Sequence, residues 1–299
     1  MIGLIGIGNI GMAVAEALLR ASYCVVGFSK TNMPAFAALG GTAAASPMAV
    51  AQSAAIILCC LPDEDAARDV YEGESNIISG LGAGTIVIDL ASYSLGFKED
   101  LATKISAAGG TLLDGEVTGD PDMLRLRTGV IYLSGDEHAC RLCLPICRAI
   151  VPEIFVLGPY GSSSKMKLVN NLLVAIHTTA AAEAMALGVK AGFAPELLAS
   201  ILTLSSGSSR ALTSRIPLMV ARQFYESSGP LKSNGPLKLF SKYLHYIADL
   251  AKAADSATPL FNAASRIYEE ALHQGFDSGD MSIVYEIISA RGCDAAVVQ

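Results

Sequence analysis

The sequence has no tryptophan and little charge: of its 299 residues, 16% are Asp, Glu, Lys or Arg, and 6% are aromatic. Hydrophobic residues make up 52%. Disordered chains combine low hydrophobicity with high net charge, so this composition excludes that class. At about 150 residues per domain, the length predicts a folded chain of about two domains.

Basic residues are not in excess. Lys and Arg number 21 against 28 Asp and Glu, which gives a formal net charge of −7. Nucleic-acid binders carry strongly basic faces, and polybasic runs mark membrane surfaces. We therefore expect neither nucleic acid nor a membrane among the partners.

Long uninterrupted hydrophobic runs are also missing. The most apolar stretch, residues 172–192, contains His177, Thr178, Thr179, Glu183 and Lys190. A membrane span needs about 18 consecutive apolar residues, so we interpret the stretch as a long buried helix. No basic residue precedes Arg20, so we expect no signal peptide and a cytoplasmic protein.

Cysteines are present, but a second CxxC pair is not. The densest group is His138, Cys140, Cys143 and Cys147. A structural metal site needs four converging ligands. Cys140, Cys143 and Cys147 recur at helical spacing, as buried apolar residues do, so we predict no metal site here.

A glycine-rich turn opens the chain. Residues 2–7 read as a strand, residues 12–20 as a helix, and Gly6, Gly8, Asn9, Ile10 and Gly11 lie in the turn between them. In this context Gly6 allows a tight turn, Gly8 lets the backbone approach a pyrophosphate, and Gly11 allows close helix packing. The pattern predicts a dinucleotide site at the helix N-terminus.

The second strand, residues 23–28, ends at Ser29, Lys30 and Thr31. NAD-specific folds place an acidic residue here, which bonds the ribose hydroxyls. The sequence offers hydroxyls and a lysine instead, which suit a 2′-phosphate. We therefore predict NADP as the cofactor, ahead of NAD.

Strand-like runs alternate with helical stretches up to about residue 160, which predicts an α/β doubly wound parallel sheet. They cover residues 55–61, 85–89, 111–113 and 129–133, and we interpret 61–63, 89–92 and 114–121 as loops at the ligand edge. The remainder is predicted all-helical, with helices at 165–191, 195–204, 237–254, 259–274 and 280–291 and a loop at 227–236. We expect a nucleotide-binding domain over 1–160 and a helical substrate and dimerisation domain over 161–299.

Lys167 and Asn171 stand one helical turn apart and share a helix face. A lysine beside a substrate suits general acid–base work. Spacing alone leaves a solvated surface pair as the alternative.

In motif order and nearly end to end, the chain resembles the β-hydroxyacid dehydrogenases, the superfamily of 3-hydroxyisobutyrate and 6-phosphogluconate dehydrogenases. The matching segments are Gly6–Gly11, Ser29-Lys30-Thr31, Leu61-Pro62-Asp63, 114–135, 158–171, Lys242-Tyr243-Leu244 and 275–282.

The resemblance implies a Rossmann-type domain followed by a helical domain, in a homodimer or homotetramer. It implies Lys167 as catalytic acid–base, with Asn171 supporting it and Lys242 near substrate and nicotinamide. It implies Thr118 and Gly119 at the substrate carboxylate. Leu61, Pro62 and Ser92 would contact the cofactor. The implied substrate is a small 3-hydroxy acid or its semialdehyde.

The substrate loop departs from the family pattern at four charged positions. Glu116 replaces a proline, Asp120 a glycine, and Arg125 and Arg127 stand where the family has Glu and Gly. The two arginines are candidates to bind a second anionic group of a substrate, with solvated loop charges as the alternative.

Two alternatives stay open. Imine reductases share this architecture, and Glu116 and Asp120 suit a cationic imine, although their catalytic position typically carries Asp or Tyr rather than Lys167. The other alternative is a non-catalytic NADP-binding protein.

Overall fold

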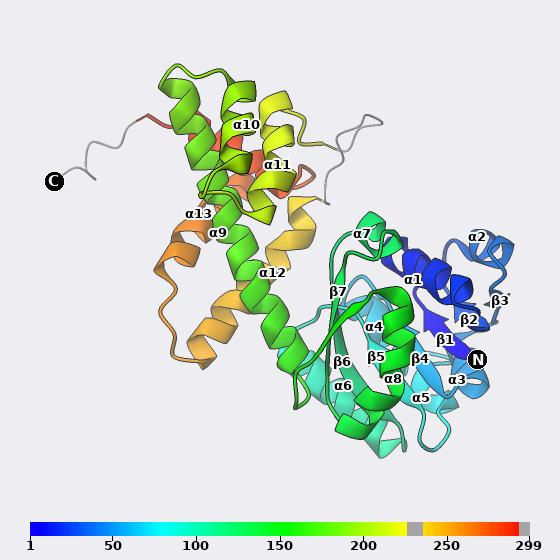
Figure 1. Cartoon of the computed structure of the whole chain (residues 1–299). Coiled ribbons are helices and arrows are strands. Elements are labelled where there is room, and N and C mark those ends of the chain that lie inside the picture. Colours follow the sequence, from blue (N-terminus) through cyan, green and yellow to red (C-terminus); the bar gives the residue numbers. More distant parts are fainter. Residues whose placement is uncertain (226–235, 293–299) are drawn as a thin grey trace. The chain divides into compact units, whose positions relative to one another are not determined.

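The structure is a computed structural model that describes residues 1–225 and 236–292. The predicted loop at 227–236 therefore lies almost wholly outside the described residues. The chain divides into two compact units, Met1–Lys167 and Leu168–Gln299. Helix α9 (Ser162–Lys190) begins in the first unit and continues into the second (Figure 1).

The first unit contains an eight-stranded sheet in the order β3-β2-β1-β4-β5-β6-β7-β8. Its strands are β1 (Ile2–Ile5), β2 (Val25–Phe28), β3 (Thr42–Ala43), β4 (Ile56–Cys59), β5 (Ile86–Asp89), β6 (Thr111–Thr118), β7 (Val130–Ser134) and β8 (Glu153–Val156). The order β3-β2-β1-β4-β5-β6 is that of dinucleotide-binding sheets. The chain adds strands outwards from β1 on one side and then from β4 on the other, so the strand order reverses between β1 and β4. The predicted α/β fold is confirmed.

The sheet differs from the prediction at its last strands. β6 and β7 pair antiparallel, from Asp114 opposite Ser134 to Thr118 opposite Val130. Only 11 residues join these strands, and a parallel pair needs a crossover of about a dozen or more. The prediction of a loop at 114–121 is therefore wrong for residues 114–118, because the pairing with β7 extends β6 to Thr118.

Helices cover both faces of the sheet, as a sheet with two apolar faces requires. They are α1 (Asn9–Arg20), α2 (Met33–Ala38), α3 (Pro47–Ser53), α4 (Glu64–Glu72), α5 (Ile77–Gly80), α6 (Leu95–Ala107), α7 (Pro121–Arg125) and α8 (Glu137–Ile150). Successive strand residues point to opposite faces: Leu4 packs with α1 and α8, while Ile5 packs with α3, α4 and α6. Cys140, Cys143 and Cys147 are buried in the α1–α8 core.

Beyond α9, the second unit is helical in its described residues. The elements are α10 (Pro195–Leu204), α11 (Arg210–Ala221), α12 (Leu237–Ala253), α13 (Pro259–His273), the short 3₁₀ helix η1 (Met281–Ile283) and α14 (Val284–Ala290). They enclose one core, which includes Met185, Ile216, Phe261 and Tyr268. Helix α11 was not predicted from the sequence.

Among the described residues, α9 is the one helix with the length and apolar composition to cross a membrane. However, 44% of its most apolar stretch is buried inside the protein. Thr178 and Thr179 are among its buried residues. The core helix of a helical domain has these same properties, so length and composition are weak support for a span.

Candidate active site

The glycine turn after β1 has the geometry of a dinucleotide-binding loop. Gly6 has a φ of +85°, in the region that favours glycine. A Cβ on Gly11 would lie 1.9 Å from the carbonyl oxygen of Gly6, so α1 meets the turn too closely for any side chain. A Cβ on Gly8 would have nothing within 4 Å.

These features fit a pyrophosphate. Gly8 is the N-cap of α1 and adopts an extended conformation, and no side chain caps the helix there. The first amide groups of a helix bind anions, and the space beside Gly8 leaves the backbone approachable. The backbone of Asn9 and Ile10 lies in this first turn. Nicotinamide dinucleotides therefore fit this end of α1.

The other predicted site segments follow the carboxyl ends of neighbouring strands. The glycine turn follows β1, Ser29–Thr31 follow β2, Leu61 and Pro62 follow β4, and Ser92 follows β5. Thr118 is the last residue of β6, and Gly119 follows it. In the sheet these strands run in the order β2-β1-β4-β5-β6. Ligands of such sheets bind along this edge. The sequence segments thus form one row in the first unit.

At the β2 end of this row, the ammonium of Lys30 lies 2.8 Å from a carboxylate oxygen of Asp69 on α4. The two side chains are 76% and 55% exposed. Exposed pairs of this kind contribute about 0–1 kcal/mol, so Asp69 holds this lysine only weakly.

At the β6 end, Lys167 Nζ donates a hydrogen bond to the backbone carbonyl of Val117. Lys167 lies in the second turn of α9 and is half-buried. Val117 is adjacent to Thr118, and Gly119 follows with a φ of +129°. The structure therefore places the predicted catalytic amine against the predicted substrate loop.

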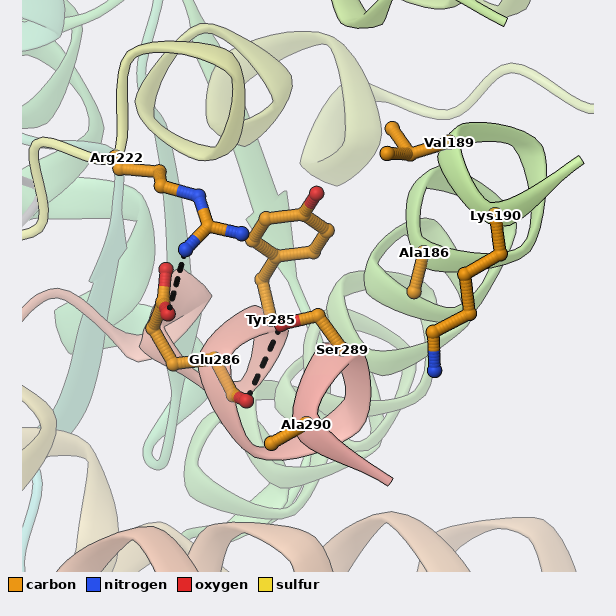
Figure 2. A pocket seen from close by; sticks show the side chains of 8 residues that line it. All are labelled: Ala186, Val189, Lys190, Arg222, Tyr285, Glu286, Ser289 and Ala290. Carbon is orange, nitrogen blue, oxygen red and sulfur yellow. Dashed lines mark hydrogen bonds and ion pairs between the residues drawn. The ribbon is translucent and has the colours of Figure 1, made fainter. Parts of the chain in front are cut away.

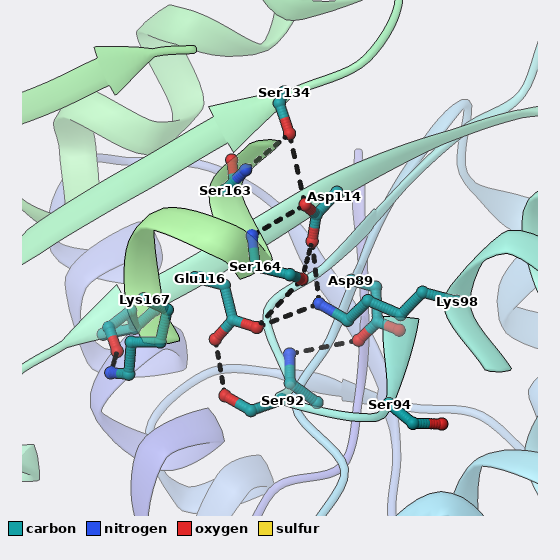
Figure 3. Close-up of polar contacts among 12 residues, drawn as sticks. Asp89, Ser92, Ser94, Lys98, Asp114, Glu116, Ser134, Ser163, Ser164 and Lys167 are labelled. Carbon is teal, nitrogen blue, oxygen red and sulfur yellow. Dashed lines mark hydrogen bonds and ion pairs between the residues drawn. The ribbon is translucent and has the colours of Figure 1, made fainter. Parts of the chain in front are cut away.

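The first turn of α9 is fixed to the sheet by hydrogen bonds (Figure 3). Asp114 accepts from the backbone N–H of Ser164 at 2.9 Å and from its hydroxyl at 2.7 Å. Ser134, opposite Asp114 in the sheet, accepts from the N–H of Ser163 at 3.0 Å. A carboxylate at a helix N-terminus satisfies the orphan N–H groups and the helix dipole. These hydrogen bonds anchor the start of α9, and so fix the position of Lys167, one turn further along, relative to β6.

A buried ion cluster, formed by Lys98, Asp114 and Glu116, lies beneath this anchor. Lys98 Nζ lies 2.8 Å from Asp114 Oδ1 and 3.0 Å from Glu116 Oε1, and its side chain has no exposed surface. Burial alone would lower the pKa of Lys98, but the nearby carboxylates raise it, so the amine stays charged. Burial opposes ionisation of Asp114, yet Lys98 and Ser164 hold its pKa below the ordinary value.

Asp89 lies next to this cluster, opposite Asp114 in the sheet. Its Oδ1 accepts from the N–H of Ala91 at 3.1 Å. Burial raises the pKa of Asp89 from 3.8 to about 7, against the opposing effects of Lys98 and the Ala91 N–H. The folded state therefore binds this proton more tightly than the unfolded state.

This shift predicts a pH-dependent stability. Between about pH 4 and pH 7 the folded chain holds the Asp89 proton and the unfolded chain loses it, so this contribution to stability falls as pH rises. Asp89→Asn removes the titration and keeps an acceptor for Ala91. We expect the variant's advantage over the wild type in free energy of unfolding to grow by up to about 1.4 kcal/mol per pH unit between about pH 4 and pH 7. Above about pH 7 this advantage should stay constant.

Urea denaturation at several pH values measures this difference. Asp65→Asn, at an exposed position on α4, is the control and should track the wild type. An Asp89→Asn advantage of equal size at pH 5 and pH 8 would contradict the expectation.

The four charged departures of the substrate loop all have partners within the first unit. Arg125 bonds Glu16 at 2.9 Å and Asp122 at 3.1 Å, and Arg127 donates to the carbonyls of Arg148 and Ala149 at the end of α8. Asp120 caps α7 by accepting from the N–H of Met123 at 2.8 Å. Glu116 belongs to the ion cluster. The structure supports the solvated-charge alternative for the arginines, because local ion pairs and helix carbonyls already engage them.

The remaining predicted site residues lie in the helical unit. Asn171 is buried in α9, one turn beyond Lys167. Lys242 lies in α12, with its ammonium 5.5 Å from the ring centre of Tyr243. This unit also holds a cavity of about 310 Å³ beside Lys190, Arg222 and Tyr285 (Figure 2). None of the predicted site residues lines it.

Comparison with known proteins matches both parts of the chain. A family model described as the NAD binding domain of 6-phosphogluconate dehydrogenase matches residues 1–158. A second, described as NAD-binding of NADP-dependent 3-hydroxyisobutyrate dehydrogenase, matches residues 161–288. With the dinucleotide-binding sheet and glycine turn, these matches define an NAD(P)-dependent oxidoreductase.

Individual relatives are consistent with this class. L-threonate dehydrogenase of Cupriavidus necator is 30% identical over 289 residues, which cover 96% of this chain and 95% of that protein. The crystal structure of a 3-hydroxyisobutyrate dehydrogenase from Salmonella typhimurium matches with a TM-score of 0.85 and 25% identity, covering 96% and 99% of the two chains. The chain therefore belongs to the β-hydroxyacid dehydrogenase family and is a hydroxyacid dehydrogenase of the 3-hydroxyisobutyrate type.

An imine reductase from Myxococcus stipitatus matches with a TM-score of 0.62 and 16% identity, covering 96% of this chain and 99% of that one. Likeness at this identity shows a shared fold alone.

Proposed function

We propose that this protein uses NADP to interconvert a small 3-hydroxy acid and its carbonyl form, with Lys167 as general acid–base. Residues 1–160 would bind the cofactor, and residues 161–299 would complete the substrate site and the subunit interface. Asn171 and Lys242 would support the reaction from the helical domain. Thr118 and Gly119 would hold the substrate carboxylate through a hydroxyl and backbone N–H groups.

The observation that carries this proposal is the hydrogen bond from Lys167 to Val117, at the end of the row of strand ends. Neighbouring strands lie about 4.8 Å apart, so β6 stands about 14 Å from the glycine turn on β1. A dinucleotide with its pyrophosphate at β1 would place its nicotinamide near β5 and β6. Lys167 then lies where the reacting carbon of a bound substrate is expected.

The chemistry follows from this placement. A bound nicotinamide supplies the acceptor or donor of hydride. In the oxidation direction the Lys167 amine takes the proton of the substrate hydroxyl as the hydride leaves the same carbon, which becomes a carbonyl. In the reduction direction the Lys167 ammonium returns that proton to the oxygen. The Val117 carbonyl directs the lysine side chain towards the substrate loop.

The preference for NADP rests on Lys30. Its ammonium sits at the carboxyl end of β2, where the ribose 2′-position is expected, and its exposed partner Asp69 holds it weakly. A charged hydrogen bond contributes about 1.5–3 kcal/mol. We expect Lys30→Ala to raise the Kd of NADP by about tenfold or more and to leave the Kd of NAD nearly unchanged.

Fluorescence titration with NADPH and NADH measures both constants. Lys104→Ala is the matched control. Lys104 lies in the last turn of α6 and, like Lys30, forms exposed ion pairs, here with Glu72 and Asp100. Wild-type protein that binds NADH more tightly than NADPH would refute the NADP assignment.

An imine reductase of the same fold is the second candidate, and the site supports it less. Glu116 and Asp120, the carboxylates that suit a cationic imine, are committed to Lys98 and to the cap of α7. Incubation with NADPH and either a cyclic imine or a 3-oxo acid semialdehyde separates the two. Oxidation of NADPH by the imine alone would favour the reductase.

We also propose that a second copy of the chain covers one face of α9 and α10. Large apolar side chains are exposed along this face, namely Val169, Leu173, Leu187, Leu197, Ile201 and Leu204. Exposed large apolar side chains gathered on one side of a helix are typical of interfaces. Light scattering at micromolar concentration should give a dimer or tetramer, and a monomer would count against this assembly.

A further inference from the structure

Glu116 contacts side chains from three other segments of the first unit. It lies on β6, immediately before Val117, and its side chain is 2% exposed. Its Oε1 lies 3.0 Å from Lys98 Nζ on α6 and 3.4 Å from the hydroxyl of Ser164 on α9. Its Oε2 accepts a hydrogen bond of 2.5 Å from the hydroxyl of Ser92, in the loop after β5 (Figure 3).

This carboxylate is paired with a buried ammonium, that of Lys98. Lys98 is fully buried, so it needs carboxylate partners, and Glu116 and Asp114 provide them. An ionised carboxylate can accept hydrogen bonds but cannot donate them. In the 2.5 Å contact with Oε2, the Ser92 hydroxyl is therefore the donor and turns its hydrogen towards Glu116.

This requirement fixes the orientation of the Ser92 hydroxyl. A serine hydroxyl has one hydrogen and two lone pairs. Because the hydrogen of Ser92 points to Glu116, its oxygen can act towards every other group only as an acceptor. Ser92 therefore selects for partners that carry an N–H or O–H group.

The place of Ser92 indicates which partner it meets. It follows β5, which is two strands, or about 10 Å, from the pyrophosphate turn on β1. If the glycine turn on β1 holds the pyrophosphate, the nicotinamide end of the cofactor would lie near this strand. The nicotinamide carries a carboxamide, whose NH₂ group is a donor.

We propose that Glu116 is a positioning residue, which orients the Ser92 hydroxyl so that Ser92 accepts a hydrogen bond from the carboxamide NH₂ of the bound nicotinamide. This inference rests on the proposed cofactor, but it does not depend on the identity of the substrate. It assigns a role to the glutamate that replaces a proline of the family motif.

A modified cofactor tests this hydrogen bond directly. In the 3-acetylpyridine analogue of NADP, a methyl group replaces the carboxamide NH₂, so the donor is removed and the carbonyl remains. One hydrogen bond of ordinary strength corresponds to a difference of about threefold to tenfold in Kd. We expect wild-type protein to bind NADP more tightly than the analogue by this factor, measured by calorimetric titration.

Two variants distinguish the roles of the residues. Ser92→Ala removes the acceptor, and Glu116→Gln introduces an amide that can donate to Ser92 and so release the serine hydrogen. Both should lower the ratio of the analogue's Kd to the Kd of NADP from about threefold to tenfold to near one. Glu116→Gln leaves Lys98 paired with Asp114, so the buried ammonium keeps a carboxylate partner and we expect the fold to be preserved.

Ser94→Ala is the matched control. Ser94 lies two residues beyond Ser92, but its hydroxyl donates to Glu64 at 2.7 Å and caps α6. Its loss should lower the melting temperature and leave the ratio of the two Kd values at the wild-type level. This separates a local structural effect from cofactor positioning.

The outcomes divide clearly. If the ratio of the two Kd values in Ser92→Ala equals that of the wild type, the contact with the carboxamide is overturned. A ratio that is lost in Ser92→Ala but survives in Glu116→Gln overturns the positioning role of Glu116. Wild-type protein that binds neither dinucleotide overturns this inference and the proposed function together, whereas tight binding without turnover of any 3-hydroxy acid overturns the proposed function alone.

Discussion

Lys167→Ala is expected to lower kcat by about 10²–10⁴-fold, the usual loss when a general acid–base is removed. The Kd of the dinucleotide should change little, because the residues proposed to bind its phosphates, in the glycine turn on β1 and at Lys30 after β2, lie at the opposite end of the row. The hydrogen bond from Lys167 to Val117 explains how this amine reaches the substrate loop. Steady-state kinetics and a fluorescence titration measure the two quantities.

Lys165→Ala is the matched control for this variant. Lys165 lies two residues earlier in α9 and is exposed, and about 200° of helical rotation separates it from Lys167. Its removal should leave kcat within about twofold of the wild type. Small primary amines should partly restore turnover to Lys167→Ala, which a purely structural lysine would not permit. Full activity of Lys167→Ala would remove this residue from the mechanism.

Gly8→Ala is expected to abolish tight dinucleotide binding while leaving the fold intact. The added Cβ meets nothing in the chain within 4 Å, and Gly8 has an extended backbone that alanine adopts. The free energy of unfolding should stay within about 0.5 kcal/mol of the wild type. The same methyl group would stand where the pyrophosphate approaches the backbone. Loss of the charged hydrogen bonds between the pyrophosphate and the backbone amides should raise the Kd of the dinucleotide about 10–100-fold.

Gly11→Ala provides the contrast. In an ordinary helix this change would stabilise the chain by about 1 kcal/mol, because alanine is the better helix former. Here the added Cβ would lie 1.9 Å from the carbonyl oxygen of Gly6, a backbone atom that cannot move cheaply. Overpacking of this kind costs about 1–3 kcal/mol or more, so we expect a net loss of stability.

Urea denaturation without cofactor separates these two glycine variants. If Gly8→Ala and Gly11→Ala lost equal stability and bound the dinucleotide equally, the assignment of different roles to the two glycines would be contradicted.

Local patterns in the sequence predicted much of the fold. The glycine turn, the alternation of strands with helices, and α10 (Pro195–Leu204) were predicted because the deciding residues are neighbours in the chain. Helix α11 was missed because the serine- and glycine-rich residues 205–209 precede it and Pro217 lies inside it. The extent of β6 was missed because its last residues form strand only by pairing with β7.

The ion cluster shows what local patterns cannot supply. Lys98 begins a run of three charged residues, Lys98 to Asp100, as on an exposed helix face, so nothing in the sequence indicated that Lys98 is buried. Its partners Asp114 and Glu116 lie 16 and 18 residues away on another element. Glu116 was noted as a departure from the family motif, but its link to Ser92 depends on β5 and β6 being neighbours in the sheet. Tertiary contacts decide such positions.

The most direct test of the proposed function is an assay of nicotinamide absorbance with a panel of small 3-hydroxy acids, each with NADP and with NAD. We expect reduction of NADP by at least one of these acids, slower reduction of NAD, and a rate lower by about 10²–10⁴-fold in Lys167→Ala. Reduction of neither cofactor by any 3-hydroxy acid, in protein that binds NADPH tightly, would contradict the proposal.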